Sequence, residues 1–308
     1  MIEVRRLRLL RELAARGTVA AVATACHLTP SAVSQQLAVL EREAGVRLVE
    51  RAGRTLRLTE AARRLVAHTE VILSDLERAH ADLAALSDSV RGTVHLAAFP
   101  TAMRTLVPTA LGRCRQEHPE LRVVLHQLEP EQSLPALKLG DLDVAVCYEY
   151  DLLPHQTDPG LELALMLVDP MQVALPAGHP ATAETVALGK LRDERWIAAP
   201  DGTACHAHIV RACAPAGFTP RIEAYSDDFT ATLAMVEAGL GVSLLPELAT
   251  STQRTRAELR PVADMPLDRR LLAAVRSGSA QHPAFAAVIN ALTTTASAMH
   301  TVGRHRLT

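Results

Sequence analysis

The stretch Leu28-Thr29-Pro30-Ser31-Ala32-Val33-Ser34-Gln35-Gln36-Leu37 decides the fold of the first part of the chain. It predicts the start of a helix, because threonine is a good N-cap and a proline at the first helical position loses no hydrogen bond. Val33, Leu37 and the later Leu40 would form the apolar face of this helix. The serine and glutamine side chains would lie toward the opposite face.

Two shorter helices are predicted before this stretch. Leucines recur at helical spacing from Leu7 to Leu13, and Gly17 would end that helix. Thr18 can cap the second helix, which would end at a turn formed by His27-Leu28. Two helices joined by a tight turn, the second of which starts with small polar residues, form the helix-turn-helix pattern.

A two-stranded wing is predicted after the third helix. Between Gly45 and Leu58, two short apolar segments flank a turn that contains Gly53. Arg51 and Arg54 would lie near the tip of this wing. From there, guanidinium groups can reach phosphates or a narrow minor groove.

The third helix carries residue types that bind DNA. A recognition helix enters the major groove by its N-terminal end, and hydroxyl and amide side chains can donate to base edges and accept from them. A polar face that is merely solvated is the alternative. However, residues 1–64 carry a net charge of +6 and the rest of the chain −8, which favours a nucleic-acid partner for the first segment. The predicted groove contacts are Thr29, Pro30, Ser31, Ser34 and Gln35.

The composition fits a globular protein of more than one domain. The chain has 308 residues, of which 48% are hydrophobic and 21% charged, and this excludes a disordered protein. No run of about 18 apolar residues predicts a transmembrane helix. The start of the chain, Met1 to Arg6, lacks the apolar stretch of a signal peptide, so we expect a cytoplasmic protein without a membrane partner. Five scattered cysteines do not indicate a disulfide framework.

A long helix is predicted after the wing, capped by Thr59 and followed by a linker that ends at Gly92. From Leu58 to Leu86, nine positions step alternately by four and three residues, and eight of them are apolar. Such a heptad repeat predicts a coiled coil between two copies of the chain. The alternative is an amphipathic helix that lies on its own domain. The predicted dimerisation residues are Leu65, Ile72, Leu76, Leu83 and Leu86.

Several of these motifs, in this order, resemble the LysR-type transcriptional regulators. The resemblance lies in the run from Leu28 to Leu37 with Leu40-Glu41, in the wing, and in Leu58-Thr59-Glu60-Ala61, and it extends over essentially the whole chain. Val49 and Ala62 depart from the family pattern, which usually has Phe and Gly there. The resemblance implies a transcription regulator rather than an enzyme. Such a regulator would bind a dyad-related site in double-stranded DNA as a homodimer or homotetramer, and would respond to a small-molecule effector.

The rest of the chain predicts a two-lobed α/β sensor. Strands and helices alternate from Thr93 onward, which is typical of a mainly parallel sheet with helices on both faces. The layout resembles periplasmic binding proteins and the effector-binding domain of the LysR family. We therefore expect a winged helix-turn-helix DNA-binding domain over 1–58, a linker helix and hinge over 59–92, and an effector-binding domain over 93–308. Its first lobe would cover about 93–167 and 277–300, and its second lobe about 168–276.

A ligand in such a fold lies at the carboxyl ends of strands, between the lobes. Loops that follow the predicted strands therefore supply the candidate effector contacts, and the family's effector contacts map onto the same loops. For each threonine among them, capping of a helix is the alternative role. The candidates are Phe99, Pro100, Thr101, Ala102, Tyr148, Thr203, Ala204 and Asp227.

A Cys/His group after these loops leaves alternatives open. Cys205 and Cys213 would lie about 12 Å apart along one helix, and His206 and His208 would diverge, so a small buried cysteine with surface histidines is the default. The segment Asp201 to Cys205, with one extra residue, resembles the peroxide-sensing branch of the family. A redox or metal sensor that uses Cys205 and Cys213 is thus the alternative regulator, and an enzyme that uses the cleft is a further one. No catalytic set stands out, and we predict no metal and no cofactor.

Overall fold

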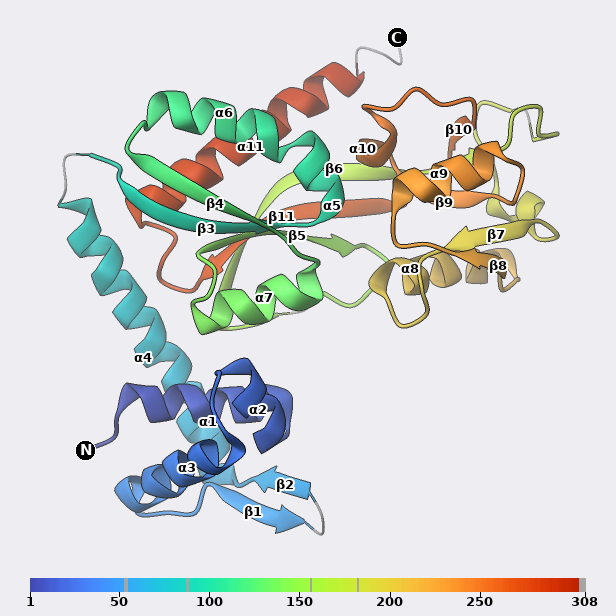
Figure 1. Ribbon diagram of the computed structural model, residues 1–308. Helices are drawn as coiled ribbons and strands as arrows, with labels where there is room; N and C mark the ends of the chain where they lie inside the picture. The colour runs from blue at the N-terminus through green and yellow to red at the C-terminus, as the bar shows by residue number, and fades with distance from the viewer. Residues whose placement is uncertain (53–54, 87–88, 156, 182, 305–308) are drawn as a thin grey trace. The chain divides into compact units, whose positions relative to one another are not determined.

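The computed structural model describes residues 1–52, 55–86, 89–155, 157–181 and 183–304, with the backbone alone at 51, 52, 55 and 300–304 (Figure 1). The chain divides into two compact units. The first unit contains Met1–Ser87 together with the short segments Pro159–Glu162 and Arg276–His282. The second unit contains Asp88–Asp158, Leu163–Val275 and Pro283–Thr308.

The first unit begins with three helices, α1 (Val4–Arg16), α2 (Val19–Ala25) and α3 (Pro30–Ala44). The hydroxyls of Thr18 and Thr29 accept hydrogen bonds from the backbone N–H groups of Ala21 and Ala32, at 3.1 and 3.2 Å. Gly17 ends α1 with a φ of 74°, a left-handed conformation that glycine adopts at little cost. The predicted helix-turn-helix and its caps are therefore confirmed.

The predicted wing is also present. Its strands β1 (Val49–Ala52) and β2 (Thr55–Leu58) are antiparallel, with Val49 opposite Leu58. The carboxylate of Glu41 on α3 accepts hydrogen bonds from the backbone N–H groups of Leu48 and Val49, at 2.8 and 3.1 Å. This contact fixes the wing to the third helix. The predicted tip residue Arg54 lies outside the described residues, as does the side chain of Arg51.

A helix of 26 residues, α4 (Glu60–Ala85), follows the wing. Thr59 caps it as predicted, since its hydroxyl accepts from the N–H of Ala62 at 3.1 Å. The first turns of α4 belong to the core of the unit, because Ala62 is completely buried and Leu65 packs against the same cluster. That cluster consists of Leu7, Leu9, Leu10, Leu13, Val22, Ala23, Val33, Leu37, Leu40, Leu48 and Ala62.

The second unit is built on a sheet of seven strands. The strand order is β10-β6-β11-β5-β3-β4, and β9 also pairs with β6. In the first lobe, β3 is parallel to both β4 and β5, as the alternation of strands and helices predicts. Figure 1 shows α6 and α11 on one face of this part of the sheet and α7 on the other. The elements of this lobe are β3 (Gly92–Ala98), α5 (Pro100–Thr105), α6 (Val107–Glu117), β4 (Leu121–Gln127), α7 (Pro130–Leu139), β5 (Val144–Tyr150) and α11 (Pro283–Arg304).

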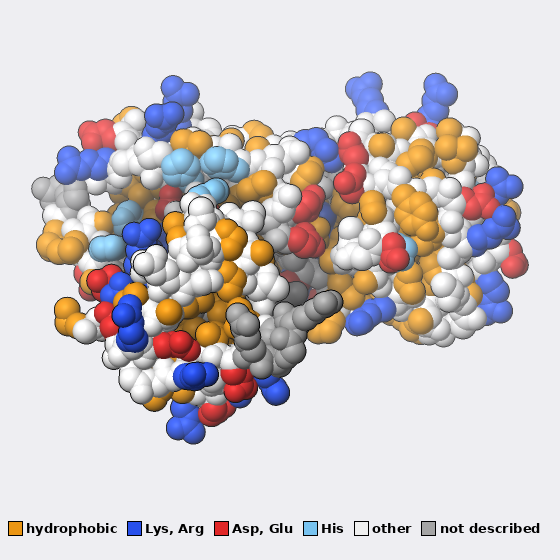
Figure 2. Space-filling model, turned by 60° about the horizontal axis from the view of Figure 1, so that its bottom comes forward, with side chains coloured by type: hydrophobic (Ala, Val, Ile, Leu, Met, Phe, Trp, Pro, Cys, Tyr) orange, Lys and Arg blue, Asp and Glu red, His pale blue; other side chains and the backbone are white. Residues whose placement is uncertain are grey.

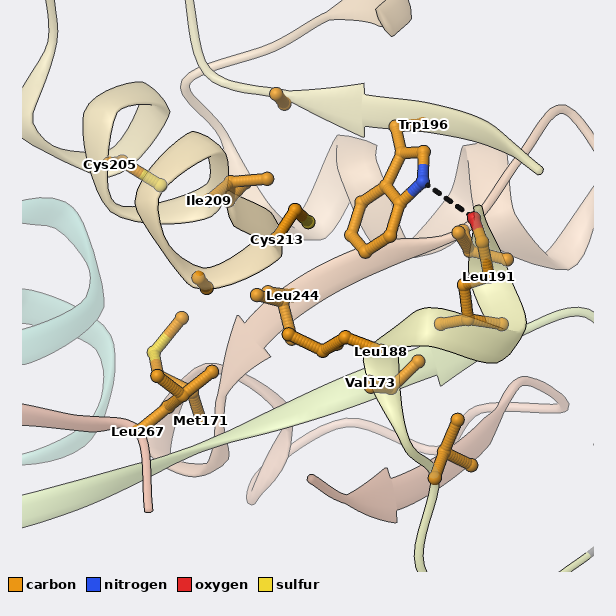
Figure 3. Packing of buried hydrophobic residues seen from close by; sticks show 14 of the residues in the cluster. Met171, Val173, Leu188, Leu191, Trp196, Cys205, Ile209, Cys213, Leu244 and Leu267 are labelled. Atoms are coloured by element: carbon orange, nitrogen blue, oxygen red, sulfur yellow. Dashed lines mark hydrogen bonds between the residues drawn. The ribbon is translucent and has the colours of Figure 1, made fainter. Parts of the chain in front are cut away.

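The second lobe packs around a completely buried tryptophan. Trp196 donates from its indole N–H to the carbonyl of Leu191 at 3.2 Å, amid the hydrophobic cluster that Figure 3 shows. Its strand β7 runs parallel to β8 and forms a bridge to Val242. The elements are η1 (Leu188–Leu191), β7 (Arg195–Ala198), α8 (Ala204–Cys213), η2 (Ala214–Ala216), β8 (Arg221–Tyr225), α9 (Phe229–Glu237), β9 (Ser243–Pro246), α10 (Glu247–Thr250) and β10 (Glu258–Pro261).

Two long strands, β6 (Leu161–Leu175) and β11 (Asp268–Arg276), differ from the sequence prediction. The exposed start of β6 lacks the alternation of buried and exposed residues by which a strand is recognised in a sequence. β11 pairs antiparallel with β5 from Arg269 to Ala274. β11 therefore belongs to the same sheet as the first lobe's strands β3, β4 and β5. The short strand β10 was not predicted.

No helix in the described part of the chain combines the length and the apolar character needed to cross a membrane.

Candidate functional site

The N-terminal end of α3 presents a polar face to solvent. Thr29, Pro30, Ser31, Ser34 and Gln35 are all exposed, whereas Val33 and Leu37 of the same helix are buried. The hydroxyls of Thr29 and Ser31 lie 3.0 Å apart, and the hydroxyl of Thr29 also accepts from the N–H of Ala32 in the first turn. All five predicted groove residues thus occupy one accessible end of one helix.

Ion pairs within the unit hold this helix in place. Arg6 of α1 donates from Nη2 and Nε to the two carboxylate oxygens of Glu43 on α3, at 2.7 and 3.0 Å. Both side chains are largely buried, so the pair fixes α3 against α1 better than an exposed pair would. Elsewhere on the protein, Figure 2 shows basic and acidic side chains interspersed over the visible face.

The heptad positions of α4 fall into two groups. The first positions are covered by the unit itself, since Ala62 and Thr69 are completely buried and Leu65 is half-buried. The later positions are exposed: Ile72 and Leu76 by 38% each, Leu83 by 66% and Leu86 by 80%. The amphipathic packing considered as an alternative thus describes the start of α4, while an apolar stripe remains uncovered on its second half.

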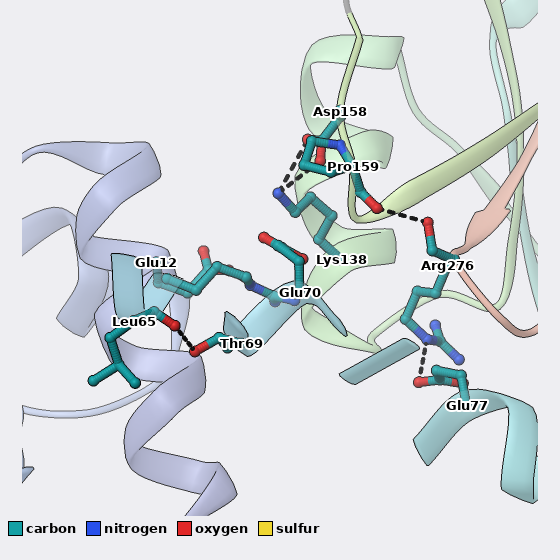
Figure 4. Close-up of polar contacts among 11 residues, drawn as sticks. Glu12, Leu65, Thr69, Glu70, Glu77, Lys138, Asp158, Pro159 and Arg276 are labelled. Atoms are coloured by element: carbon teal, nitrogen blue, oxygen red, sulfur yellow. Dashed lines mark hydrogen bonds and ion pairs between the residues drawn. The ribbon is translucent and has the colours of Figure 1, made fainter. Parts of the chain in front are cut away.

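A short loop contacts the middle of α4 within the first unit. Arg276 donates from Nε to the carboxylate of Glu77 at 2.8 Å, as Figure 4 shows. Gly278 lies so close that a Cβ atom on it would come within 2.2 Å of the carbonyl oxygen of Ser74. The backbone N–H of Gly278 also donates to the carboxylate of Glu162 at 2.6 Å. These contacts hold the segment 276–278 against α4.

The second unit contains a cavity at the ends of several strands. The volume that the centres of water molecules can occupy in this cavity is about 110 Å³. Six of the eight predicted effector contacts line it, namely Phe99, Pro100, Thr101, Tyr148, Thr203 and Asp227. The other two do not: Ala102 is completely buried, and Ala204 is a half-buried residue of the first turn of α8. The remaining lining residues are Arg104, Glu129, Glu131, Ala199, Cys205, Asp228, Phe229 and Arg269.

Arg269 is the central side chain of this cavity and was missed by the sequence analysis. It is completely buried and donates from Nε and Nη2 to one carboxylate oxygen of Asp169, at 3.1 and 2.7 Å. Its guanidinium lies 5.1–5.7 Å from the ring centres of Phe99, Tyr148 and Phe229, a cation–π arrangement. Arg269 lies at the start of the antiparallel strand β11. Candidates taken from the carboxyl ends of parallel strands therefore do not include it.

Glu129 could have been found by the same rule that found the others, because it follows β4. Its carboxylate accepts a hydrogen bond from the hydroxyl of Tyr148 at 3.1 Å. Burial raises the pKa of Glu129, and the charges of Glu131 and Asp227 raise it further, while the hydrogen bond from Tyr148 and the charge of Arg269 lower it. Burial also raises the pKa of the Tyr148 phenol. The phenol is therefore the donor in this pair.

Two side chains of the cavity lining cap helices: Thr203, for which capping was the alternative role, and Asp228, which was not among the predicted contacts. The hydroxyl of Thr203 accepts from the N–H of His206 at 3.2 Å and donates to the carbonyl of Pro200 at 2.8 Å. Asp228 accepts from the N–H of Thr230 at 2.7 Å, which caps α9. The side-chain oxygens of both residues are hydrogen-bonded to backbone groups, although both residues line the cavity.

Comparison with known proteins identifies the two units. Residues 4–63 match the bacterial regulatory helix-turn-helix protein of the lysR family, and residues 87–297 match the LysR substrate binding domain. The chain belongs to the LysR family. It is a DNA-binding transcription regulator with an effector-binding domain, and its relatives are regulators rather than enzymes.

Individual members of the LysR family agree with this assignment. The chain is 29% identical to the transcriptional dual regulator GltC of Bacillus subtilis, over 89% of this chain and 91% of that protein. It is 28% identical to the dual regulator OxyR of Escherichia coli, over 83% and 82%. The structure of a Corynebacterium glutamicum OxyR C206 mutant matches with a TM-score of 0.61 and 25% identity, over 98% and 94% of the two chains. Full-length CbnR in complex with its target DNA has the same fold, with a TM-score of 0.56 and 22% identity, over 96% and 100%.

Some LysR-family relatives are named as hydrogen peroxide-inducible activators. The burial and pKa of the cysteines of α8 therefore bear on the alternative that this chain is a redox sensor. Cys205 and Cys213 are both free thiols and both buried, in the hydrophobic cluster of Figure 3. Burial raises the pKa of each thiol, that of Cys213 to about 12. A protonated, buried thiol reacts slowly with oxidants, because the thiolate is the nucleophile. Among the described residues, no cluster of three His, Cys, Asp or Glu side chains could hold a metal.

The expectation that both histidines of α8 lie at the surface is wrong for His208. His208 is completely buried and stacks on the ring of Tyr150, with ring centres 4.5 Å apart. Neither ring nitrogen has a hydrogen-bond partner among the described residues, and burial lowers the pKa of His208 to about 4. His206 is half-buried, and its Nδ1 lies 3.1 Å from the carbonyl oxygen of Ala199.

Proposed function

We propose that this LysR-family regulator contacts bases in the major groove through Thr29, Pro30, Ser31, Ser34 and Gln35 of α3. The observation that carries this proposal is the exposed, capped N-terminal end of α3, which α1 holds in place. Hydroxyl and amide groups there can exchange hydrogen bonds with base edges. We assign Arg51 and Arg54 of the wing to phosphates or the minor groove.

We also propose that two copies of the chain pair through the exposed stripe of α4. Leu65, Ile72, Leu76, Leu83 and Leu86 follow a heptad repeat, and the last four expose much of their apolar surface. An uncovered stripe of this kind favours association in water. Two paired helix-turn-helix domains would bind a dyad-related DNA site as a homodimer, or as a homotetramer built from two dimers.

The cavity of the second unit is proposed as the effector site. We assign Phe99, Pro100, Thr101, Tyr148, Thr203 and Asp227 to it, with Arg269 as a residue that positions the surrounding aromatic rings. Ala102 and Ala204 support the loops from behind. An effector that binds one arrangement of the lobes more tightly would shift the population toward it and so change the geometry of paired DNA-binding domains.

The domain division that goes with this function is residues 1–58 for DNA binding, 59–92 for the linker helix and hinge, and 93–308 for effector binding. A regulator of this kind works where the chromosome lies, so we propose that it is located in the cytoplasm.

Footprinting on the intergenic region beside the protein's own gene tests the DNA-binding proposal. We expect protected segments repeated at the helical period of DNA, with an affinity that falls steeply as salt increases. The variant Gln35→Ala should weaken specific binding at least tenfold, while Gln116→Ala, an exposed glutamine of α6, should not. Equal footprints for both variants would contradict the assignment of α3.

Sedimentation tests the pairing proposal. We expect Leu83→Asp to shift the protein toward monomers, because a carboxylate would lie in the apolar seam. Asp82→Glu, at an exposed position beside it, is the matched control. Unchanged mass for Leu83→Asp would contradict the coiled coil.

Sensing of an oxidant at Cys205 is the second candidate. It is favoured by relatives named as peroxide-inducible activators, and opposed by the burial of the thiol in this chain.

A further inference from the structure

The cavity of the second unit has an excess of carboxylates. Four acidic side chains line it, against two guanidinium groups. The acidic residues come from the start of α7 and from the loop and first turn before α9. The lining charges are Glu129, Glu131, Asp227 and Asp228, with Arg104 and Arg269.

Both guanidinium groups already have acidic partners. Arg269 is bound by Asp169, which lies behind the cavity and is 2% exposed, at 2.7 Å. Nη1 of Arg104 lies 3.7 Å from a carboxylate oxygen of Asp228 at the solvent-exposed side. Each guanidinium is thus paired with one acidic side chain, and of the remaining acids of the lining Glu129 is the one whose pKa the charge of Arg269 lowers.

Three carboxylates remain without a basic partner. Among the described residues, Glu129, Glu131 and Asp227 form no ion pair, and the only hydrogen bond to them comes from the hydroxyl of Tyr148 to Glu129. The negative charges of Glu131 and Asp227 raise the pKa of Glu129, as its burial does. Glu129 is thus repelled by both Glu131 and Asp227, and a positive charge beside it would offset that repulsion.

A hydroxyl of the lining is available at the same place. Thr101 lines the cavity and is only 3% exposed, and its hydroxyl has no hydrogen-bond partner among the described residues. Its oxygen does not belong to the fully buried unpartnered atoms of these residues, so it keeps access to the cavity, where a polar group of a ligand can bond it. Its place in the lining puts it in the same small space as the carboxylates.

We infer that the effector of this regulator is a small organic cation, with an ammonium or guanidinium group held by Glu129, Glu131 and Asp227 and a hydrogen-bonding group at Thr101. Among the described residues, no group of three His, Cys, Asp or Glu side chains could hold a metal ion, so the acidic lining suits a larger organic cation instead. The inference rests on the proposed function in taking this cavity as the effector site. The volume that the centres of water molecules can occupy in the cavity, about 110 Å³, favours a compact ligand.

Thermal unfolding of the full-length protein tests the inference, because a ligand that binds the native state raises the unfolding temperature. The cationic probes are putrescine, agmatine and L-lysine, and the anionic probes of similar length are succinate and glutarate. Magnesium chloride is included as a simple cation, and all samples have the same ionic strength. We expect at least one organic cation at 10 mM to raise the unfolding temperature by 2 °C or more, and the dicarboxylates to have no effect.

Three variants localise the binding. Glu129→Gln and Asp227→Asn should each weaken calorimetric binding of the active probe at least tenfold, and Thr101→Val should weaken it as well. Asp193→Asn, an exposed acid outside the cavity, should leave binding unchanged. Asp227 is exposed, so its variant is expected to fold, and circular dichroism of each variant without probe checks this.

Four outcomes would overturn the inference. One is a response to succinate or glutarate only, and another is no response to any organic cation at 10 mM. The third is binding of the cation that persists in both Glu129→Gln and Asp227→Asn, and the fourth is stabilisation by magnesium chloride alone. Each of these outcomes leaves the DNA footprint of the unliganded protein unaffected, so a failure of the regulator assignment is recognised separately, by the loss of that footprint.

Discussion

Nη2 of Arg269 lies 2.7 Å from Oδ2 of Asp169, and both side chains are almost completely buried. The two residues lie on the neighbouring strands β11 and β6, beneath the cavity. The other oxygen of Asp169 accepts from the backbone N–H of Leu248 at 2.8 Å. One carboxylate therefore holds the guanidinium around which Phe99 and Tyr148 pack.

Removal of this carboxylate charge should destabilise the effector-binding domain strongly. Asp169→Asn leaves the guanidinium of Arg269 buried without a counter-charge, and such changes cost about 3–5 kcal/mol of unfolding free energy. Urea unfolding followed by tryptophan fluorescence reports on this domain, because Trp196 lies in its core and is the only tryptophan. Asp193→Asn is the control, and equal stability of the two variants would show that the pair contributes little.

The stability of the same domain should fall in mild acid because of His208. Its pKa is lowered by burial from 6.5 to about 4, so the unfolded chain binds this proton at a higher pH than the folded protein does. The contribution is complete above pH 6.5 and decreases as the pH falls toward 4, by at most about 3 kcal/mol. We expect His208→Phe to keep the stacking on Tyr150 and to reduce this dependence of stability on pH.

The matched variant for this experiment is His206→Phe, in which a half-buried histidine of the same helix is replaced. Urea unfolding at pH 7 and pH 5 measures both variants. If His208→Phe and the wild-type protein lose equal stability between these pH values, the acid sensitivity arises elsewhere.

The loop that contacts α4 should not tolerate a side chain at Gly278. Its φ of 88° is strained for any other residue, at a cost of about 1–3 kcal/mol. A Cβ atom would in addition clash with Ser74, because it would lie only 2.2 Å from the carbonyl oxygen of that residue. Gly278→Ala should therefore lower the unfolding temperature more than Gly178→Ala, whose φ of 76° is similar but whose Cβ would meet open space.

Limited proteolysis gives a second measurement of this variant. Loss of the contact should expose the chain around Ser74 and speed cleavage at nearby arginines such as Arg78. Equal effects of the two alanine substitutions on both unfolding and cleavage would show that the close approach to Ser74 is unimportant.

The thiol of Cys205 should react slowly in the native protein. It is 7% exposed and its pKa is raised by burial, so little thiolate is present at neutral pH. We expect hydrogen peroxide at a concentration that does not unfold the protein to leave its DNA affinity unchanged, in the wild type and in Cys205→Ser alike. A peroxide-dependent change that disappears in Cys205→Ser would establish the redox sensor instead.

Local signals made the first unit predictable. Thr18, Thr29 and Thr59 each cap the helix that the sequence indicated, and Gly17 ends α1, because caps depend on residues a few positions apart. The heptad pattern of α4 predicts a coiled coil, and this stays a prediction. However, only the structure shows that the unit itself covers its first positions.

Contacts between distant residues explain what the sequence could not predict. Asp169 and Arg269 are separated by 100 residues, and no local pattern links them. Glu129 was not predicted, although it follows a parallel strand as Tyr148 does, whereas Arg269 reaches the cavity from the start of the antiparallel strand β11. His208 was misplaced because a histidine on a helix gives no sign of the tyrosine that stacks on it.

Recognition of DNA by α3 is tested most directly by the affinity of wild type and Ser34→Ala/Gln35→Ala for the footprinted DNA and for a scrambled duplex of equal length, at one salt concentration. We expect the double variant to lose at least tenfold in affinity for the specific DNA and to keep its affinity for the scrambled duplex, because base contacts specify the sequence while phosphate contacts do not. Equal losses on both duplexes, or no loss on either, would contradict recognition of the site by the N-terminal end of α3.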